Sequence, residues 1–285
     1  MYIGYVLLIS LNSIYLLMLY LLKGLQTEWL KTSRTFIVWY VIICPFILAG
    51  LMFLVFWLSG LEKMAGVGEK AVDINFWKEL IRGGYFSLSN PFLILFIVLL
   101  NTMLYAREHQ GNMWKHLYAL PVPRWSVFGA KSLFAILLLA LSLVCFVLFL
   151  TLTGYLLDVI KPAYKFASHD NMLGKHSLLA FRIFVSSLGI WAIHNWLSLR
   201  FKGFGLSMGI AIISIIVTPF MLLGSAKMKD WVYLYPYLYP YYSAEDFAGK
   251  DNLANLWQPE IYGSLLYAIV FTLLGYWEYN RNRHK

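Results

Sequence analysis

The chain has 285 residues, of which 60% are hydrophobic and only 13% are charged, and its mean hydropathy is +0.67. An ordinary soluble domain carries about 25% charged residues, so the composition excludes that class. The formal net charge is +9, and what this excess means depends on where the basic residues lie along the chain.

Six apolar stretches reach the roughly 18–20 residues that a helix needs to cross a bilayer. They do not alternate between apolar and polar residues, as the strands of a membrane barrel would. The segments between them are too short to hold a sizeable soluble core. We therefore predict an all-α polytopic membrane protein with six transmembrane helices, at about 36–58, 86–105, 126–157, 177–199, 203–224 and 261–279.

Four short basic segments, at 23–34, 107–131, 200–202 and 281–285, fall on one side of this topology. They hold twelve of the 23 Lys and Arg residues, whereas only three of the 14 acidic residues, Glu28, Glu108 and Glu278, fall on that side, so that side carries the whole net charge. Basic residues close to span ends favour the cytosolic side. We therefore place these segments and the C-terminus in the cytosol. Topology accounts for the basic charge, and no nucleic-acid partner is expected.

The first 34 residues contain two kinds of apolar segment. Residues 1–17 are almost wholly apolar, so they begin either an extra span or an extension before a translation start at Met18. Residues 19–34 place leucines and Trp29 on one helix face and Lys31 elsewhere, with Arg34 at the end. This pattern is typical of a helix that lies flat in the membrane interface.

His194 and Asn195 are polar neighbours inside the fourth predicted span. An ionisable residue within a membrane is a functional candidate because burying it is costly. Polar side chains in membranes also commonly form hydrogen bonds between helices. We favour this structural role, because we see no carboxylate that would complete a proton relay.

The segment 233–242 reads YLYPYLYPYY. Its prolines, Pro236 and Pro240, are expected to prevent a regular helix. Two interpretations stay open. Tyr235 and Tyr239 could belong to an aromatic belt at the membrane interface, or the segment could be a broken one that closes the outer end of a pathway.

The loop 106–125, between the second and third spans, contains a short stretch with helical periodicity. Such a helix, with its apolar patch at the membrane boundary, either lies on lipid or enters a groove on a partner protein. Four apolar residues define the patch, Lys115 lies on the other side, and Pro121 ends the helix. The patch residues are Met113, Trp114, Leu117 and Leu120.

The sequence contains no phosphate-binding loop, no metalloprotease motif and no nucleophile motif. We therefore expect no catalytic residue, no metal site and no cofactor bound by this chain. If ATP and Mg²⁺ drive its action, they bind to a partner chain.

A family resemblance rests on three segments. The first is Glu108-x5-Trp114-Lys115-x-Leu117-x2-Leu120-Pro121-x2-Arg124-x6-Lys131. The others are the run from Glu28 to Phe36 and the run Leu197–Lys202. Together they resemble ABC-2-type transporter permeases (type V exporter-like), in particular the bacitracin and lantibiotic-immunity branch. The resemblance covers the chain from about Met18 to its end.

This resemblance implies a non-catalytic, six-span export subunit of the bacterial cytoplasmic membrane. Such subunits pair with a second permease copy or a related permease and bind an ABC ATPase subunit. The loop would supply the coupling helix, with Glu108 at its hinge and the apolar patch in the ATPase groove. Lys115 and Arg124 would form the polar rim, and the cargo would be amphipathic, such as a peptide antibiotic.

Two other functions compete with this expectation. A self-sufficient secondary transporter or channel would work without an ATPase partner. An intramembrane enzyme would depend on His194, the ionisable residue that we singled out within a span.

Overall fold

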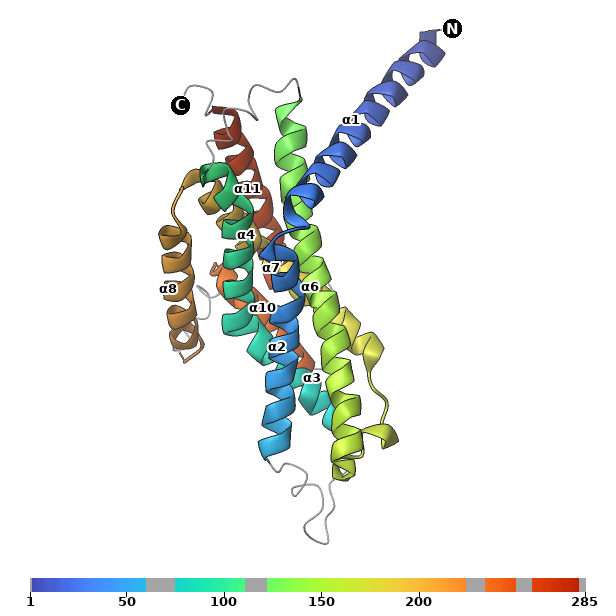
Figure 1. The fold of residues 1–285 in the computed structure, drawn as a ribbon, viewed down its shortest axis with the longest axis vertical. Coiled ribbons are helices and arrows are strands. Elements are labelled where there is room, and N and C mark those ends of the chain that lie inside the picture. The colour runs from blue at the N-terminus through green and yellow to red at the C-terminus, as the bar shows by residue number, and fades with distance from the viewer. Residues whose placement is uncertain (1, 60–74, 111–121, 224–233, 250–257, 282–285) are drawn as a thin grey trace.

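The structure is a computed structural model that describes residues 2–59, 75–110, 122–223, 234–249 and 258–281. Within these ranges every regular element is a helix (Figure 1). The α-helices are α1 (Tyr2–Thr32), α2 (Phe36–Ser59), α3 (Phe76–Ser87), α4 (Leu93–Gln110), α6 (Arg124–Ile160), α7 (Leu173–Arg200), α8 (Phe204–Leu223), α10 (Tyr239–Gly249) and α11 (Pro259–Arg281). Short 3-10 turns lie at Pro162–Tyr164, Phe166–Ser168 and Pro236–Leu238.

Among the described residues, six helical segments are long and apolar enough to cross a membrane, which confirms the predicted number of spans. Five of them match the predicted ranges within a few residues. The six are α2, the combined segment Phe76–His109, α6, α7, α8 and α11.

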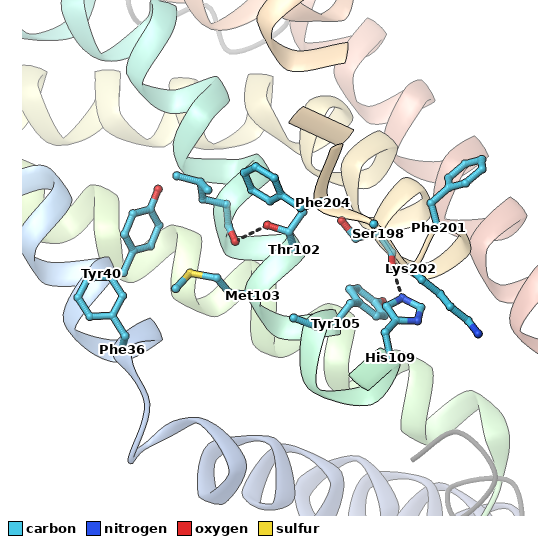
Figure 2. A pocket seen from close by; sticks show the side chains of 13 residues that line it. Phe36, Tyr40, Thr102, Met103, Tyr105, His109, Ser198, Phe201, Lys202 and Phe204 are labelled. Atoms are coloured by element: carbon cyan, nitrogen blue, oxygen red, sulfur yellow. Dashed lines mark hydrogen bonds between the residues drawn. The ribbon is translucent and has the colours of Figure 1, made fainter. Parts of the chain in front are cut away.

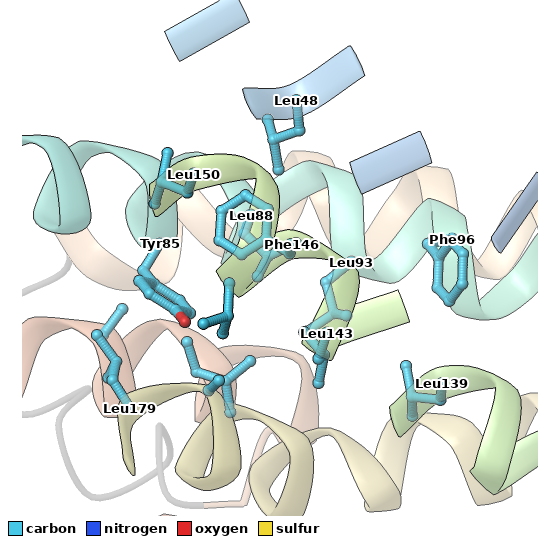
Figure 3. Close-up of a cluster of buried hydrophobic side chains, with 14 of the residues drawn as sticks. Leu48, Tyr85, Leu88, Leu93, Phe96, Leu139, Leu143, Phe146, Leu150 and Leu179 are labelled. Carbon is cyan, nitrogen blue, oxygen red and sulfur yellow. The ribbon is translucent and has the colours of Figure 1, made fainter. Parts of the chain in front are cut away.

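The six spans form one bundle with a shared apolar core. Side chains from α2, α3, α4, α6 and α7 meet at its centre (Figure 3), where Tyr85, Phe146 and Leu150 are fully buried. Large apolar side chains such as Trp39, Phe46 and Leu266 point outward and are more than half exposed. An apolar exterior of this kind suits contact with lipid rather than water.

The second span begins earlier than predicted, since residues 59–85 were expected to lie outside the membrane. Helix α3 starts at Phe76, after an Asn75 side chain that caps it by accepting a hydrogen bond from the backbone N–H of Trp77. Its charged residues recur on one face, while the opposite face is buried in the bundle. These charges lower the hydropathy of the segment, so the sequence analysis did not predict an amphipathic helix there.

Helices α3 and α4 are joined by a π-helical turn, Leu88–Phe92, in which Asn90 has extended backbone angles. The Ser89 hydroxyl donates a hydrogen bond to the carbonyl of Pro240 in α10, at 3.1 Å. The span is therefore bent near its middle and attached to α10 at the bend.

Helix α1 differs from the two separate segments predicted for residues 1–34. It is continuous from Tyr2 to Thr32 and extends away from the bundle at its N-terminal end (Figure 1). No glycine or proline interrupts it between Gly4 and Gly24, so nothing ends the helix near residue 18. Whether residues 1–17 lie in the membrane stays a prediction.

The tyrosine segment is more regular than its prolines suggested. Pro236 begins a 3-10 turn, and Pro240 lies in the first turn of α10. Proline is tolerated there because the first N–H groups of a helix have no partner within it.

We call one end of the bundle the basic end, since Lys31, Arg107, Arg124, Arg200 and Arg281 gather there at the ends of five helices. Helix α6 starts at this end and α11 finishes there. The Arg124 guanidinium donates a hydrogen bond to the backbone carbonyl of Asn280, at 3.2 Å. The short basic segments are thus brought together, as the topology predicted.

Candidate functional site at the base of the central loop

The last turns of α4 lead directly into the loop that the sequence singled out. The predicted loop range began at residue 106, but α4 stays helical to Gln110, and α6 begins at Arg124. Glu108 therefore lies in the last turn of α4, and its role as a hinge stays a prediction. The residue is 3% exposed.

Glu108 belongs to a buried charge cluster of four residues, Glu28, Lys31, Glu108 and Lys131. The Lys131 ammonium lies 2.7 Å from Oε1 of Glu108 and 3.3 Å from Oε2 of Glu28. Its Nζ donates to the backbone carbonyl of Leu104, at 3.3 Å. One lysine on α6 thus contacts a carboxylate on α4 and another on α1.

Lys31 completes the cluster from a more exposed position. Its Nζ lies 2.6 Å from Oε1 of Glu28 and 3.6 Å from Oε1 of Glu108. The Arg107 guanidinium also donates a hydrogen bond to the backbone carbonyl of Lys31. Two ammonium groups thus balance two carboxylates, so the cluster is neutral. Charges can be buried only when they are paired in this way.

The electrostatics of Glu28 reflect this pairing. Burial on its own raises the pKa of a carboxyl group, and burial is the largest single influence on Glu28. The neighbouring Lys131 and Lys31 together outweigh it and hold the pKa of Glu28 below its ordinary value of 4.5. Glu28 is therefore ionised at neutral pH.

The cluster requires α1 to approach α6 closely, and Gly24 makes this possible. A Cβ atom at Gly24 would lie 2.5 Å from Cβ of Ala130, well inside van der Waals contact. The two backbones can cross at this point only because residue 24 has no side chain, and this crossing brings Glu28 within reach of Lys131.

The same end of α4 is attached to α7. The Tyr105 hydroxyl donates to Oδ1 of Asn195, at 3.0 Å, and the His109 Nε2 atom lies 2.8 Å from the carbonyl oxygen of Ser198. Lys131 lies 4.9 Å from the ring centroid of Tyr105, within the range of a cation–π contact. The last two turns of α4 thus contact α1, α6 and α7.

A cavity of about 390 Å³ lies beside this end of α4 (Figure 2). Its walls come from the start of α2, the second half of α4, and the junction between α7 and α8. Phe36 and Tyr40 lie on one side, and Lys202 and Phe204 lie on the other.

These observations can be set beside a comparison with known families. A family model described as ABC-2 family transporter protein matches residues 24–218, more than half of the chain. The chain belongs to the ABC-2 transporter family. A comparison with curated proteins found no match. Members of this family are membrane components of transporters and not themselves catalysts, and they imply an ABC ATPase partner.

In this ABC-2 protein, the intramembrane pair His194 and Asn195 forms hydrogen bonds between helices. The His194 ring contacts the Ser207 hydroxyl on α8 at 2.8 Å and the Tyr237 hydroxyl at 3.0 Å. Asn195 accepts the hydrogen bond from Tyr105. Contacts of this kind are what the structural role requires, and the role itself stays a prediction.

The central part of the tyrosine segment, residues 236–240, is buried in the bundle. Pro236, Tyr239 and Pro240 are buried, and Tyr235 is half-buried with its hydroxyl donating to the Ser214 carbonyl at 3.0 Å. An interfacial belt would be exposed to lipid headgroups, and the burial of three of these four residues argues against that interpretation without testing it. Their burial is compatible with the second interpretation, a segment that closes the outer end of a pathway, and that role stays a prediction.

The remaining predicted site residues fall into two groups. In α1 and the turn after it, Trp29 and Arg34 are exposed, whereas Lys31 joins the charge cluster. Arg124 begins α6. The other coupling-loop residues lie outside the described residues: Met113, Trp114, Lys115, Leu117, Leu120 and Pro121.

Sequence reasoning missed a second buried ion pair. Arg182 lies within α7, fully buried, and its guanidinium is 3.4 Å from Oε1 of Glu260 at the start of α11. An arginine inside an apolar span was the available signal, because such a residue needs a partner nearby. The backbone N–H of Gly189 in α7 also donates a hydrogen bond to the Ser264 hydroxyl in α11. This hydrogen bond and the ion pair hold α7 against α11.

Proposed function

We propose that this chain is the membrane-spanning permease subunit of an ATP-binding cassette exporter, powered by a separate ATPase subunit. It would lie in the bacterial cytoplasmic membrane with its basic end and C-terminus in the cytosol, paired with a second permease. The loop 106–125 would bind the ATPase. The cargo would be amphipathic, such as a peptide antibiotic, an expectation that rests on the resemblance to the immunity branch.

The observation that carries this proposal is the charge cluster at the base of that loop. A partner that moves the loop must displace the end of α4. Glu108 at this end is paired with Lys131 on α6 and, through Lys131 and Lys31, connected to Glu28 on α1. Separating buried charges is costly, so the three helix segments would move together when the loop is pushed.

The proposal is tested by co-purifying the chain with the ABC ATPase encoded nearest to it. A variant carrying Trp114→Ala and Leu117→Asp should lose the ATPase, because both changes destroy the apolar patch. A matched control carries the same substitutions, Trp57→Ala and Leu58→Asp, at exposed positions in the last turn of α2, the end of that helix far from the basic end. This control should keep the ATPase. If the first variant retained the ATPase, the coupling assignment would be wrong.

A second measurement separates this proposal from a self-sufficient secondary transporter or channel. The chain would be reconstituted with and without the ATPase subunit, and export of a fluorescent lipophilic cation would be followed. Export that requires both the ATPase and ATP supports the proposal. Export by the chain alone, driven by an ion gradient, would favour the alternative.

A further inference from the structure

The cavity beside α4 has one apolar side and one polar side. Phe36, Tyr40, Leu99 and Met103 supply an apolar wall (Figure 2). The opposite wall is the α7–α8 junction, where Phe201, Lys202 and Gly203 also line the space. A ligand that fills such a cavity needs an apolar part and a polar part.

The polar side favours a negative charge. Lys202 lies two residues before α8, and both Gly203, which precedes this 20-residue helix, and Phe204, its first residue, line the cavity. The first N–H groups of a helix have no partner within it and carry a partial positive charge, so they attract anions. None of the described residues that line the cavity is acidic, so no carboxylate competes for these groups.

The Ser198 hydroxyl is a third polar group in the lining, beside Lys202 and the start of α8, and it has no hydrogen-bond partner among the described residues. Ser198 is 4% exposed and lines the cavity from α7, and its hydroxyl makes no hydrogen bond to any described residue. Figure 2 shows it between Thr102 and the Phe201–Lys202 pair. A buried hydroxyl without a partner is costly. Its oxygen is itself covered, so a rotation of the Ser198 side chain toward a ligand oxygen in the cavity would remove that cost.

The position of the cavity identifies the ligand class. It lies at the basic end, where α2 begins and α4 and α7 end, and therefore at the depth of lipid headgroups. The rings of Phe36, on the apolar side, and of Phe204, on the opposite side, are both exposed, so the cavity between them is accessible from the lipid. We propose that this cavity binds an anionic phospholipid of the adjacent leaflet, with the phosphate at Lys202, Ser198 and the start of α8, and an acyl chain along Tyr40 and Met103.

The test is native mass spectrometry of the full chain purified in detergent. The chain is mixed with equal amounts of phosphatidylglycerol and phosphatidylcholine that have identical acyl chains. One lysine near an anionic headgroup favours binding about fivefold, so phosphatidylglycerol should be retained about fivefold more. Lys202→Gln should abolish this preference, and Ser198→Ala should reduce retention of phosphatidylglycerol severalfold.

A matched control removes the same charge from the same end of the bundle. Lys23 is exposed on α1 and does not line the cavity, so Lys23→Gln should keep the preference. Ala106→Leu, which fills the cavity from α4, should lower retention of both lipids. Thermal unfolding of each variant shows that it remains folded.

Four results would overturn the proposal. The first is equal retention of both lipids by the unchanged chain, which indicates an apolar groove alone. The second is an equal loss of preference in Lys23→Gln, which indicates a diffuse effect of charge. The third is displacement of the lipid by excess inorganic phosphate, which indicates a site for the free anion. The fourth is a chain dimer that covers the cavity and retains no lipid.

Discussion

Removing the charge of Lys131 is the most direct perturbation of the buried cluster. Lys131→Met keeps the length of the side chain but leaves Glu28 and Glu108, each less than 5% exposed, with Lys31 alone. Breaking a buried ion pair costs about 3–5 kcal/mol. Lys31 remains 2.6 Å from one carboxylate and 3.6 Å from the other, so we expect a loss at the lower end, about 3 kcal/mol.

The assay is thermal unfolding of the purified chain in detergent. For a chain somewhat larger than 250 residues, each kcal/mol corresponds to a shift of about 2 °C in Tm, so Lys131→Met should lower Tm by about 6 °C. The double variant Lys131→Met with Glu108→Gln restores the balance of one carboxylate and one ammonium. It should therefore lose about 2 kcal/mol less than the sum of the two single variants, which is typical of residues in one network.

Lys23→Met is the control, since Lys23 is exposed on the same helix as Glu28. Its effect should stay within about 0.5 kcal/mol, as for most surface substitutions. The reasoning would be refuted if Lys131→Met cost less than about 1 kcal/mol, or if the double variant were simply additive.

Three further outcomes are expected. Gly24→Ala places a Cβ 2.5 Å from that of Ala130 and should lower stability by about 1–3 kcal/mol, as overpacking does. Gly129→Ala is the control in the same unfolding assay, and it should be neutral because the nearest atom to a new Cβ there is 3.5 Å away. His194→Leu removes two interhelical hydrogen bonds and should cost about 1 kcal/mol while ATPase co-purification persists; loss of co-purification in a folded variant would contradict its structural role. Because the pKa of Glu28 is lowered on folding, its ionised form stabilises the fold fully above its ordinary pKa of 4.5, and this contribution is lost as the pH falls through the lower folded-state value. The stability difference between the unchanged chain and Glu28→Gln should shrink in that acidic range, and a difference independent of pH would show that the charge of Glu28 is unimportant.

The positions of the spans could be predicted from the sequence because continuous apolar runs have few alternatives in a membrane. The predicted start of the second span was wrong, because charged residues lower the hydropathy of α3 although one face of this helix is buried in the bundle. Lys78, Glu79 and Arg82 lower the hydropathy of α3, yet they share the outward face of an amphipathic helix whose other face is buried. Averaging the hydropathy over the segment hides that arrangement.

The candidate site was predicted only in part, and for a different physical reason. Glu108 and Lys31 were singled out by their places near a loop and in an N-terminal helix. That both contact Glu28 and Lys131 depends on where α1 crosses α6, and this crossing depends on the absent side chain of Gly24. Spacing along the chain does not contain that information.

The break at Asn90 gives the second span two sections with different neighbours. Helix α4, the section after the break, contacts α1, α6 and α7, whereas Ser89 at the bend donates a hydrogen bond to the Pro240 carbonyl in α10. A tilt of α4 about the break at Asn90 would move the tyrosine segment before it moved Trp77 in α3. The indole N–H of Trp77 donates a hydrogen bond to the Phe166 carbonyl at 2.9 Å. The far end of the molecule can thus stay anchored while the middle of the bundle moves.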